Sequence, residues 1–161
     1  MIPMRQQHWL SLLVLIVATF GASAFGSLAT ISSLTTWYPT LAKPSWNPPN
    51  AVFGPVWTVL YLLMAIAAWL VWRRGSESAV LPAMTAYVGQ LVLNVTWSLL
   101  FFGLQSPGWA VLDIIALWIA ILFTIAQFRP VSRPAAWLLA PYLAWVTFAV
   151  ALNIAIWRLN A

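Results

Sequence analysis

The chain has 161 residues, of which 63% are apolar and 6% are charged, and its formal net charge is +5. Soluble domains carry charge on about a quarter of their residues and disordered segments have low hydrophobicity, so this composition excludes both classes. The absence of cysteine excludes disulfides, thiolate metal sites and cysteine nucleophiles. The seven basic residues are scattered rather than clustered, so no nucleic-acid partner is expected.

The positions of the charged residues indicate the class of protein. They leave uncharged intervals at 6–42, 44–72, 78–112, 114–128 and 134–157. A helix needs about 20 apolar residues to cross a bilayer, and most of these intervals are longer. We therefore predict an all-α membrane protein in which residues 1–161 form a single domain, a bundle of five transmembrane helices at about 9–31, 51–72, 80–104, 108–128 and 134–158. Residues 1–24 imitate a signal peptide, but the apolar run continues through Ile31, so we expect this segment to remain as the first helix.

The first connection, residues 32–50, differs from the short connections between the later helices. It contains four prolines and three large aromatic residues. Connections of this length without regular structure are usually functional lids or disordered segments. The prolines restrict the backbone and the aromatic rings favour packing, so we predict a stiff lid over one end of the bundle.

The loop charges predict the orientation of this multi-pass protein. With five spans, one side carries Arg5, Arg73, Arg74, Arg129 and Arg133, whereas the other carries Lys43 and Arg158. Loops rich in basic residues stay in the cytoplasm. In a bacterial inner membrane, the N-terminus is therefore predicted to be cytoplasmic, with the lid and the C-terminus on the opposite side.

The third predicted helix has a polar and aromatic face. The spacing of three and four residues places the following side chains together: Tyr87, Gln90, Asn94, Trp97 and Phe101. Amides facing lipid are unfavourable, so this face is expected to turn inward. The two amides either hydrogen-bond between helices or contact a ligand.

Aromatic side chains also form stripes on the second and fifth predicted helices. The residues concerned are Phe53, Trp57 and Tyr61 on the second helix, and Trp145, Phe148, Ala149 and Leu152 on the fifth. Either these stripes are core packing, or they line a site together with the third helix. Indoles, phenyl rings and a few amides around a common interior suit a flat, mostly apolar ligand.

The sequence offers few groups for chemistry. Asp113 is the only charge well inside a span. It has either a functional role, with Lys43 or Arg158 as candidate partners, or a structural one, as an ion pair or as a negative charge near a helix N-terminus. His8 is the only imidazole, and it lies at the end opposite the lid. No catalytic triad, carboxylate pair or metal-binding cluster is predicted, so we expect no catalytic residue of hydrolytic type, no metal and no required cofactor.

Several motifs resemble a known family. They are Trp-Tyr-Pro-Thr-Leu-Ala-Lys-Pro-Ser-Trp-Asn-Pro-Pro at 37–49, Gly-Pro-Val-Trp-Thr-Val-Leu-Tyr at 54–61, Gly-Gln-Leu at 89–91 with Asn94 and Trp97, Phe-Phe-Gly at 101–103, and Pro-Tyr-Leu-Ala-Trp at 141–145 with Leu-Asn at 152–153 and Trp-Arg at 157–158. Across essentially the whole chain the sequence resembles the TspO/translocator protein family, also called tryptophan-rich sensory proteins or peripheral-type benzodiazepine receptors.

The resemblance implies five transmembrane helices, often dimeric, around a pocket for porphyrins, sterols and benzodiazepine-site ligands that the first loop closes. The family's ligand-contacting positions correspond here to Tyr38, Pro48, Trp57, Asn94, Trp97, Trp145 and Ala149. The animal members carry a cholesterol-recognition pattern with a tyrosine directly after the Leu-Asn of the fifth helix. Here that position is Ile154, which makes sterol transport the weaker expectation.

From these observations we expect a membrane receptor or carrier that binds a protoporphyrin-like tetrapyrrole, with a role in porphyrin handling or stress signalling. A light-dependent porphyrin-degrading enzyme is the first alternative. A sterol-binding transporter or a membrane scaffold is the second. The expected partners are a tetrapyrrole or sterol-like small molecule, membrane lipid and a second copy of the chain.

Overall fold

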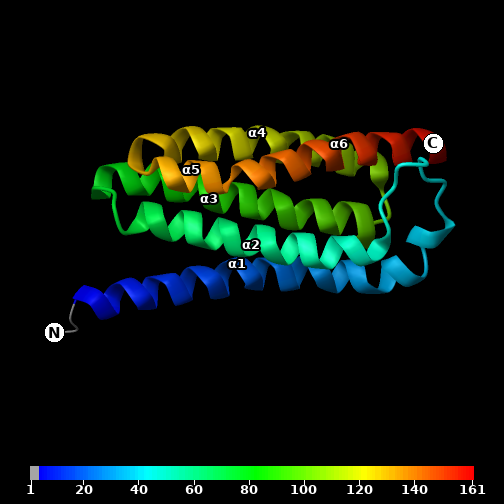
Figure 1. Cartoon of the computed structure of the whole chain (residues 1–161). Helices are drawn as coiled ribbons and strands as arrows, with labels where there is room; N and C mark the ends of the chain where they lie inside the picture. The colour runs from blue at the N-terminus through cyan, green and yellow to red at the C-terminus, as the bar shows by residue number, and fades with distance from the viewer. Residues whose placement is uncertain (1–3) are drawn as a thin grey trace.

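The computed structural model describes residues 4–161, with side chains described from Trp9 onward, so the side chains of Arg5 and His8 lie outside the described residues. The helices in chain order are α1 (Met4–Thr35), the 3-10 turn η1 (Tyr38–Thr40), α2 (Asn50–Trp72), α3 (Glu77–Ser98), the π-helical turn η2 (Leu99–Gly103), α4 (Pro107–Val131), α5 (Arg133–Leu138) and α6 (Ala140–Asn160). Figure 1 shows them as one elongated bundle. Five helical segments are long and apolar enough to cross a membrane, which confirms the predicted all-α membrane fold.

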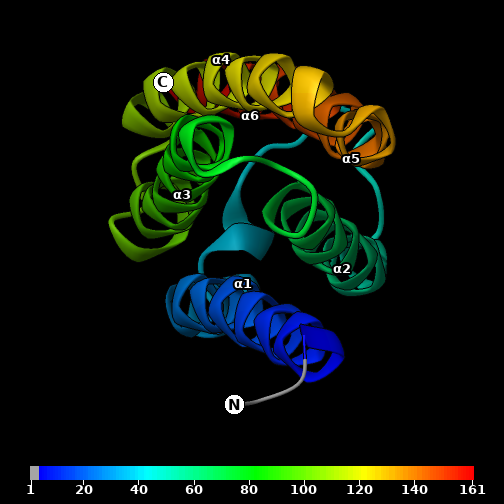
Figure 2. The same ribbon diagram turned by 90° about the vertical axis from the view of Figure 1, so that its left-hand side faces the viewer.

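The helices enclose a core that is formed mainly by α2, α3, α4 and α6. Viewed along the bundle, α4 and α6 lie side by side, and α1 lies outermost on the opposite side (Figure 2). Met64, Tyr87, Ile114 and Tyr142 are almost fully buried between these helices. The segment between α1 and α2 lies at the same end of the bundle as the C-terminus (Figure 1). The structure therefore places the predicted lid over one end of the helices.

Helix α1 continues past its predicted end at residue 31, so part of the predicted 32–50 lid is helical. Residues 32–35 contain neither proline nor glycine, and the hydroxyl of Ser33 donates to the carbonyl oxygen of Phe102 at 2.7 Å. This bond fixes the last turn of α1 against η2. The lid is thereby shortened to residues 36–49.

The third and fifth predicted helices are not uniform. The α-helical turns of α3 end at Ser98, and the wider turn η2 follows, which buries the rings of both Phe101 and Phe102. The predicted helix 134–158 is interrupted at Leu139, between α5 and α6. Pro141 has no backbone N–H to donate to the preceding turn, which explains the interruption. The break lets α5 pack against α2 while α6 packs against α4.

The arrangement of the helices gives a testable topology. Tags at the N-terminus and at residue 76 are expected on one side of the membrane, and tags at residue 40 and at the C-terminus on the other, because the five spans alternate in direction. Protease protection or thiol labelling of single cysteines in sealed vesicles measures this. Detection of both termini on the same side would contradict the five-span arrangement.

Candidate functional site

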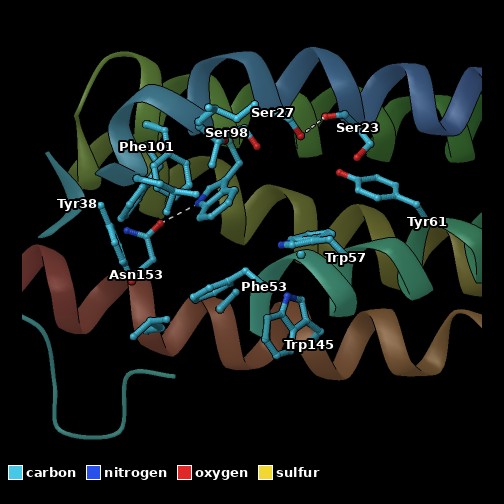
Figure 3. A pocket seen from close by; sticks show the side chains of 18 of the residues that line it. Ser23, Ser27, Tyr38, Phe53, Trp57, Tyr61, Ser98, Phe101, Trp145 and Asn153 are labelled. Carbon is cyan, nitrogen blue, oxygen red and sulfur yellow. Dashed lines mark hydrogen bonds between the residues drawn. The ribbon is translucent and has the colours of Figure 1, made fainter. Parts of the chain in front are cut away.

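A cavity of about 320 Å³ lies beneath the lid. Side chains from α1, η1, α2, α3, η2 and α6 line it. They are Ser23, Ser27, Thr30, Ile31, Leu34, Tyr38, Phe53, Gly54, Trp57, Thr58, Tyr61, Trp97, Ser98, Phe101, Phe102, Trp145, Phe148, Ala149, Leu152, Asn153 and Ile156. Figure 3 shows most of them from close by. The volume falls in the range of small-molecule sites.

One wall of the cavity is aromatic, and we call it the aromatic wall: Phe53, Trp57, Tyr61, Trp145 and Phe148. Trp57 stacks on Tyr61 with ring centroids 5.4 Å apart, and Phe53 meets Trp145 edge to face at 6.0 Å. Trp145 lies 5.4 Å from Phe148. The stripes predicted on the second and fifth helices therefore meet at one surface, as a flat ligand requires.

The opposite side of the cavity carries hydroxyl groups from α1, which we call the hydroxyl wall: Ser23, Ser27 and Thr30. Figure 3 shows Ser23 and Ser27 across the cavity from Trp57 and Trp145. The hydroxyl of Ser27 donates to the carbonyl of Ser23 at 2.9 Å, and that of Thr30 donates to the carbonyl of Gly26 at 3.0 Å. Both protons are thus held by α1 itself, while the hydroxyl oxygens remain acceptors at the cavity.

Sequence reasoning missed the hydroxyl wall, although a signal was present. The three residues recur at intervals of four and three, the spacing of one helical face. Single Ser and Thr residues in membrane helices commonly bond back to their own backbone, so the residue types alone do not mark a site.

A hydrogen-bond network closes the deep end of the cavity. The hydroxyl of Tyr61 donates to Oδ1 of Asn94, and Nδ2 of Asn94 lies 3.1 Å from the hydroxyl of Tyr142. Asn94 is 2% exposed and is not among the residues that line the cavity, so in this structure it joins three helices. A direct contact of Asn94 with a ligand stays a prediction.

Asn153, which the sequence reasoning did not single out as a site residue, organises the lid end. Its Oδ1 accepts the indole N–H of Trp97 at 2.9 Å, and its Nδ2 donates to the carbonyl of Pro107 at 3.0 Å. One amide therefore holds α3, α6 and the start of α4 together. The Trp97 ring also stacks on Phe101 at 5.4 Å, which fixes its orientation at the cavity.

The lid is held down by several polar contacts. The hydroxyl of Tyr38 donates to Oδ1 of Asn47 at 2.9 Å, and burial raises the pKa of that phenol. Nζ of Lys43 donates to the carbonyls of Tyr38 and Leu41. The side chain of Asn160, at the end of α6, pairs with both the N–H and the carbonyl of Ala42 at 2.9 Å.

Three predicted residues, Pro48, Gln90 and Asp113, have a different outcome from the aromatic ones. Pro48 and Gln90 lie outside the wall of this cavity, and their part in binding stays a prediction. Gln90 is 1% exposed, and neither atom of its amide group has a hydrogen-bond partner among the described residues. Asp113 has a buried carboxylate oxygen without such a partner, and Lys43, one of its two candidate partners, donates to carbonyls of the lid instead.

Aromatic and other uncharged side chains line the cavity. Among the described residues that line it, none is charged, and the polar ones are hydroxyls, indoles and one amide. The part of the chain that the structure describes holds no group of three His, Cys, Asp or Glu side chains that could bind a metal. Stacking surfaces with scattered hydrogen-bonding groups favour a flat, neutral, largely apolar molecule.

Comparison with known proteins agrees with the motifs. A profile described as the TspO/MBR family matches residues 12–158. The chain is 45% identical over 154 residues to the tryptophan-rich protein TspO of Archaeoglobus fulgidus, which covers 94% of this chain and 98% of that protein. It is 45% identical over 127 residues to the translocator protein of Homo sapiens, covering 77% and 75% of the two chains. It is 36% identical to the tryptophan-rich sensory protein of Cereibacter sphaeroides, covering 86% and 87%.

Proposed function

This chain belongs to the TspO/MBR family, and on that premise we propose that it is a membrane receptor or carrier that holds a protoporphyrin-like tetrapyrrole in the cavity beneath the lid. The observation that carries the proposal is the aromatic wall, in which Trp57 and Trp145 face one space from two different helices. A porphyrin is a flat aromatic ring, and stacking is the interaction that this wall provides. Benzodiazepine-site ligands, which also carry aromatic rings, should compete for the same space.

Replacement of Trp57 or Trp145 by phenylalanine tests this proposal. The smaller ring loses stacking area and the indole N–H, and aromatic contacts of this kind are worth about 0.5–1.5 kcal/mol beyond area burial. Each variant should therefore bind metal-free porphyrin roughly 2–12-fold more weakly. Tryptophan-fluorescence quenching and porphyrin absorbance in detergent measure the affinity, and the melting temperature is followed in parallel.

Two tryptophans far from the cavity serve as matched controls. Trp9 is 61% exposed near the start of α1, and Trp72 is 52% exposed at the end of α2. These two helix ends lie opposite the lid (Figure 1). Trp9→Phe and Trp72→Phe should leave porphyrin affinity unchanged. Equal affinity in all four variants would assign Trp57 and Trp145 to core packing alone.

The light-dependent degradation of porphyrin is a second candidate, and the stacking of Trp57 on Tyr61 favours it. Two oxidisable rings in contact at the cavity wall are placed to exchange electrons with an excited ligand. Illumination of the purified protein with metal-free porphyrin in air separates the two functions. Product formed over many turnovers supports the enzyme, whereas an unchanged ligand spectrum supports binding without chemistry.

A further inference from the structure

The exposure of the residues that line the cavity is uneven. Only four of the described lining residues are exposed: Ser27 and Ile31 on α1, and Gly54 and Thr58 on α2. Every other wall, including the aromatic wall and the lid, is formed by buried or half-buried side chains. The cavity is therefore open along the seam between α1 and α2, and we call these four residues the lateral opening.

The residues of the lateral opening lie at the same distance from the lid end of the bundle in both helices. Ser27 and Ile31 lie eight and four residues before the end of α1 at Thr35, and Gly54 and Thr58 lie four and eight residues after the start of α2 at Asn50. At a rise of 1.5 Å per residue, both pairs lie about 6–12 Å from the lid end of their helices. With the lid at the membrane surface, the opening therefore faces the part of the hydrocarbon layer next to that surface.

The packing around the opening leaves real space there. A Cβ atom built on Gly54 would have no neighbouring atom within 4 Å. Below the opening, α1 and α2 are in contact through Phe20 and Tyr61, with ring centroids 6.2 Å apart, and through Trp9 and Trp69 at 6.3 Å. The seam is thus closed deeper in the membrane and open at the level of the cavity.

The aqueous end of the cavity is closed in the same structure. The Tyr38 side chain is 3% exposed beneath the lid, and Asn160 bonds to both backbone groups of Ala42. The hydroxyls of Ser27 and Thr58 each donate to a carbonyl of their own helix, so the rim presents no free donor to lipid. A molecule that passes this rim meets no charged side chain among the described lining residues.

We propose that the lateral opening between α1 and α2 is the entrance of the cavity, and that the ligand arrives dissolved in the bilayer as a flat molecule whose buried part is neutral. This inference rests on the proposed function, because it presupposes a ligand in the cavity. It adds the route and the ligand's state: a molecule that is already in the membrane and enters the cavity with its uncharged part, rather than one that arrives from water through the lid.

A reversible plug at Gly54 tests the route. The natural chain has no cysteine, so Gly54→Cys in nanodiscs is labelled at one site by benzyl methanethiosulfonate, and a reductant removes the label. With the dimethyl ester of protoporphyrin as probe, the label should slow association and dissociation by the same factor, at least about tenfold. The dissociation constant should stay unchanged because an entrance alters rates without altering the bound state. Reductant should restore both rates.

Two matched variants define the outcomes. Val59→Cys carries the same label on an exposed position of α2 that does not line the cavity, and it should exchange ligand at the parent rate. Asn160→Ala releases the lid from Ala42 and should also leave the rates unchanged. Unchanged exchange in labelled Gly54→Cys together with faster exchange in Asn160→Ala would overturn the proposal in favour of the lid. Faster dissociation alone after labelling would also overturn it, because Gly54 would then belong to the binding surface.

A different experimental result would show that the proposed function, rather than the route, is wrong. If the parent protein shows no saturable binding of the porphyrin ester in nanodiscs, the ligand class is wrong whatever the route. If the parent binds and the labelled protein exchanges at the parent rate, only the route is wrong. Transfer to an excess of empty nanodiscs measures dissociation, and discs without protein give the partition rate for comparison.

Discussion

Asn94→Leu is expected to lower the free energy of unfolding by about 1–3 kcal/mol, the cost of leaving a buried hydrogen-bonding group without a partner. Tyr142 is fully buried, and Nδ2 of Asn94 donates a hydrogen bond to its hydroxyl oxygen. Tyr61 loses less because Ser23 lies beside its hydroxyl (Figure 3). Membrane hydrogen bonds average about 0.6 kcal/mol in double-mutant cycles, so the orphaned Tyr142 hydroxyl decides the size of the effect.

A second substitution provides the control for this result. Because the loss arises from an orphaned hydroxyl, Asn94→Leu combined with Tyr142→Phe should recover much of the stability. Thermal unfolding in detergent, followed by circular dichroism, measures both variants. A double variant less stable than Asn94→Leu would show that leucine fits poorly at this position, and would refute the hydrogen-bond explanation.

Ala149→Phe is expected to reduce porphyrin affinity by about 5–150-fold, since overfilling a packed space costs about 1–3 kcal/mol. Ala149 lines the cavity one turn from Trp145, so a ring at this position occupies volume that the ligand needs. The protein itself should melt near the parent temperature because the new ring enters an existing cavity. Porphyrin titration and thermal unfolding test the two statements together.

Ala144→Phe is the matched control, since Ala144 is exposed on the same helix and does not line the cavity. It should bind porphyrin as the parent does. An Ala149→Phe variant with parental affinity would place the ligand elsewhere in the protein, and would contradict the proposed function.

The fold was largely predictable because lipid limits the choice of structure. A chain that crosses hydrocarbon must satisfy its backbone hydrogen bonds internally, so long uncharged intervals indicate helices. The inward face of the third helix was predictable for a related reason: Gln90 and Asn94 are unfavourable in lipid, and both are buried. What periodicity does not provide is depth along the bundle. Gln90 shares a face with Trp97 but lies two turns below it, outside the cavity wall.

The sequence pattern did not predict where the helices depart from regular α-helical geometry. The turn η2 contains an extra residue per turn, so Phe101 and Phe102 both point inward, whereas the three-and-four spacing places only Phe101 on that face. Pro141 and Pro82 are both inside predicted spans, yet only the first coincides with a break. Pro82 is near the start of α3, where fewer turns precede it, and neighbouring packing decides such cases.

Helix α1 differs from the other spans in how firmly it is held. In the apolar 18-residue stretch of α1, 11% of the residues are buried, against 33% in the corresponding stretch of each of the other four spans. Two buried hydrogen bonds help to attach it: the hydroxyl of Tyr87 donates to Thr19, which itself donates to the carbonyl of Leu15, and the hydroxyl of Ser33 donates to the carbonyl of Phe102 at 2.7 Å. The hydroxyl wall lies between these two hydrogen bonds, which are about 21 Å apart along α1. Since long helices bend gently at little cost, a thicker guest would bow α1 outward before it displaced the aromatic rings. Under the proposed function, a thicker ligand would therefore be accommodated by the bending of this one helix rather than by movement of the aromatic wall.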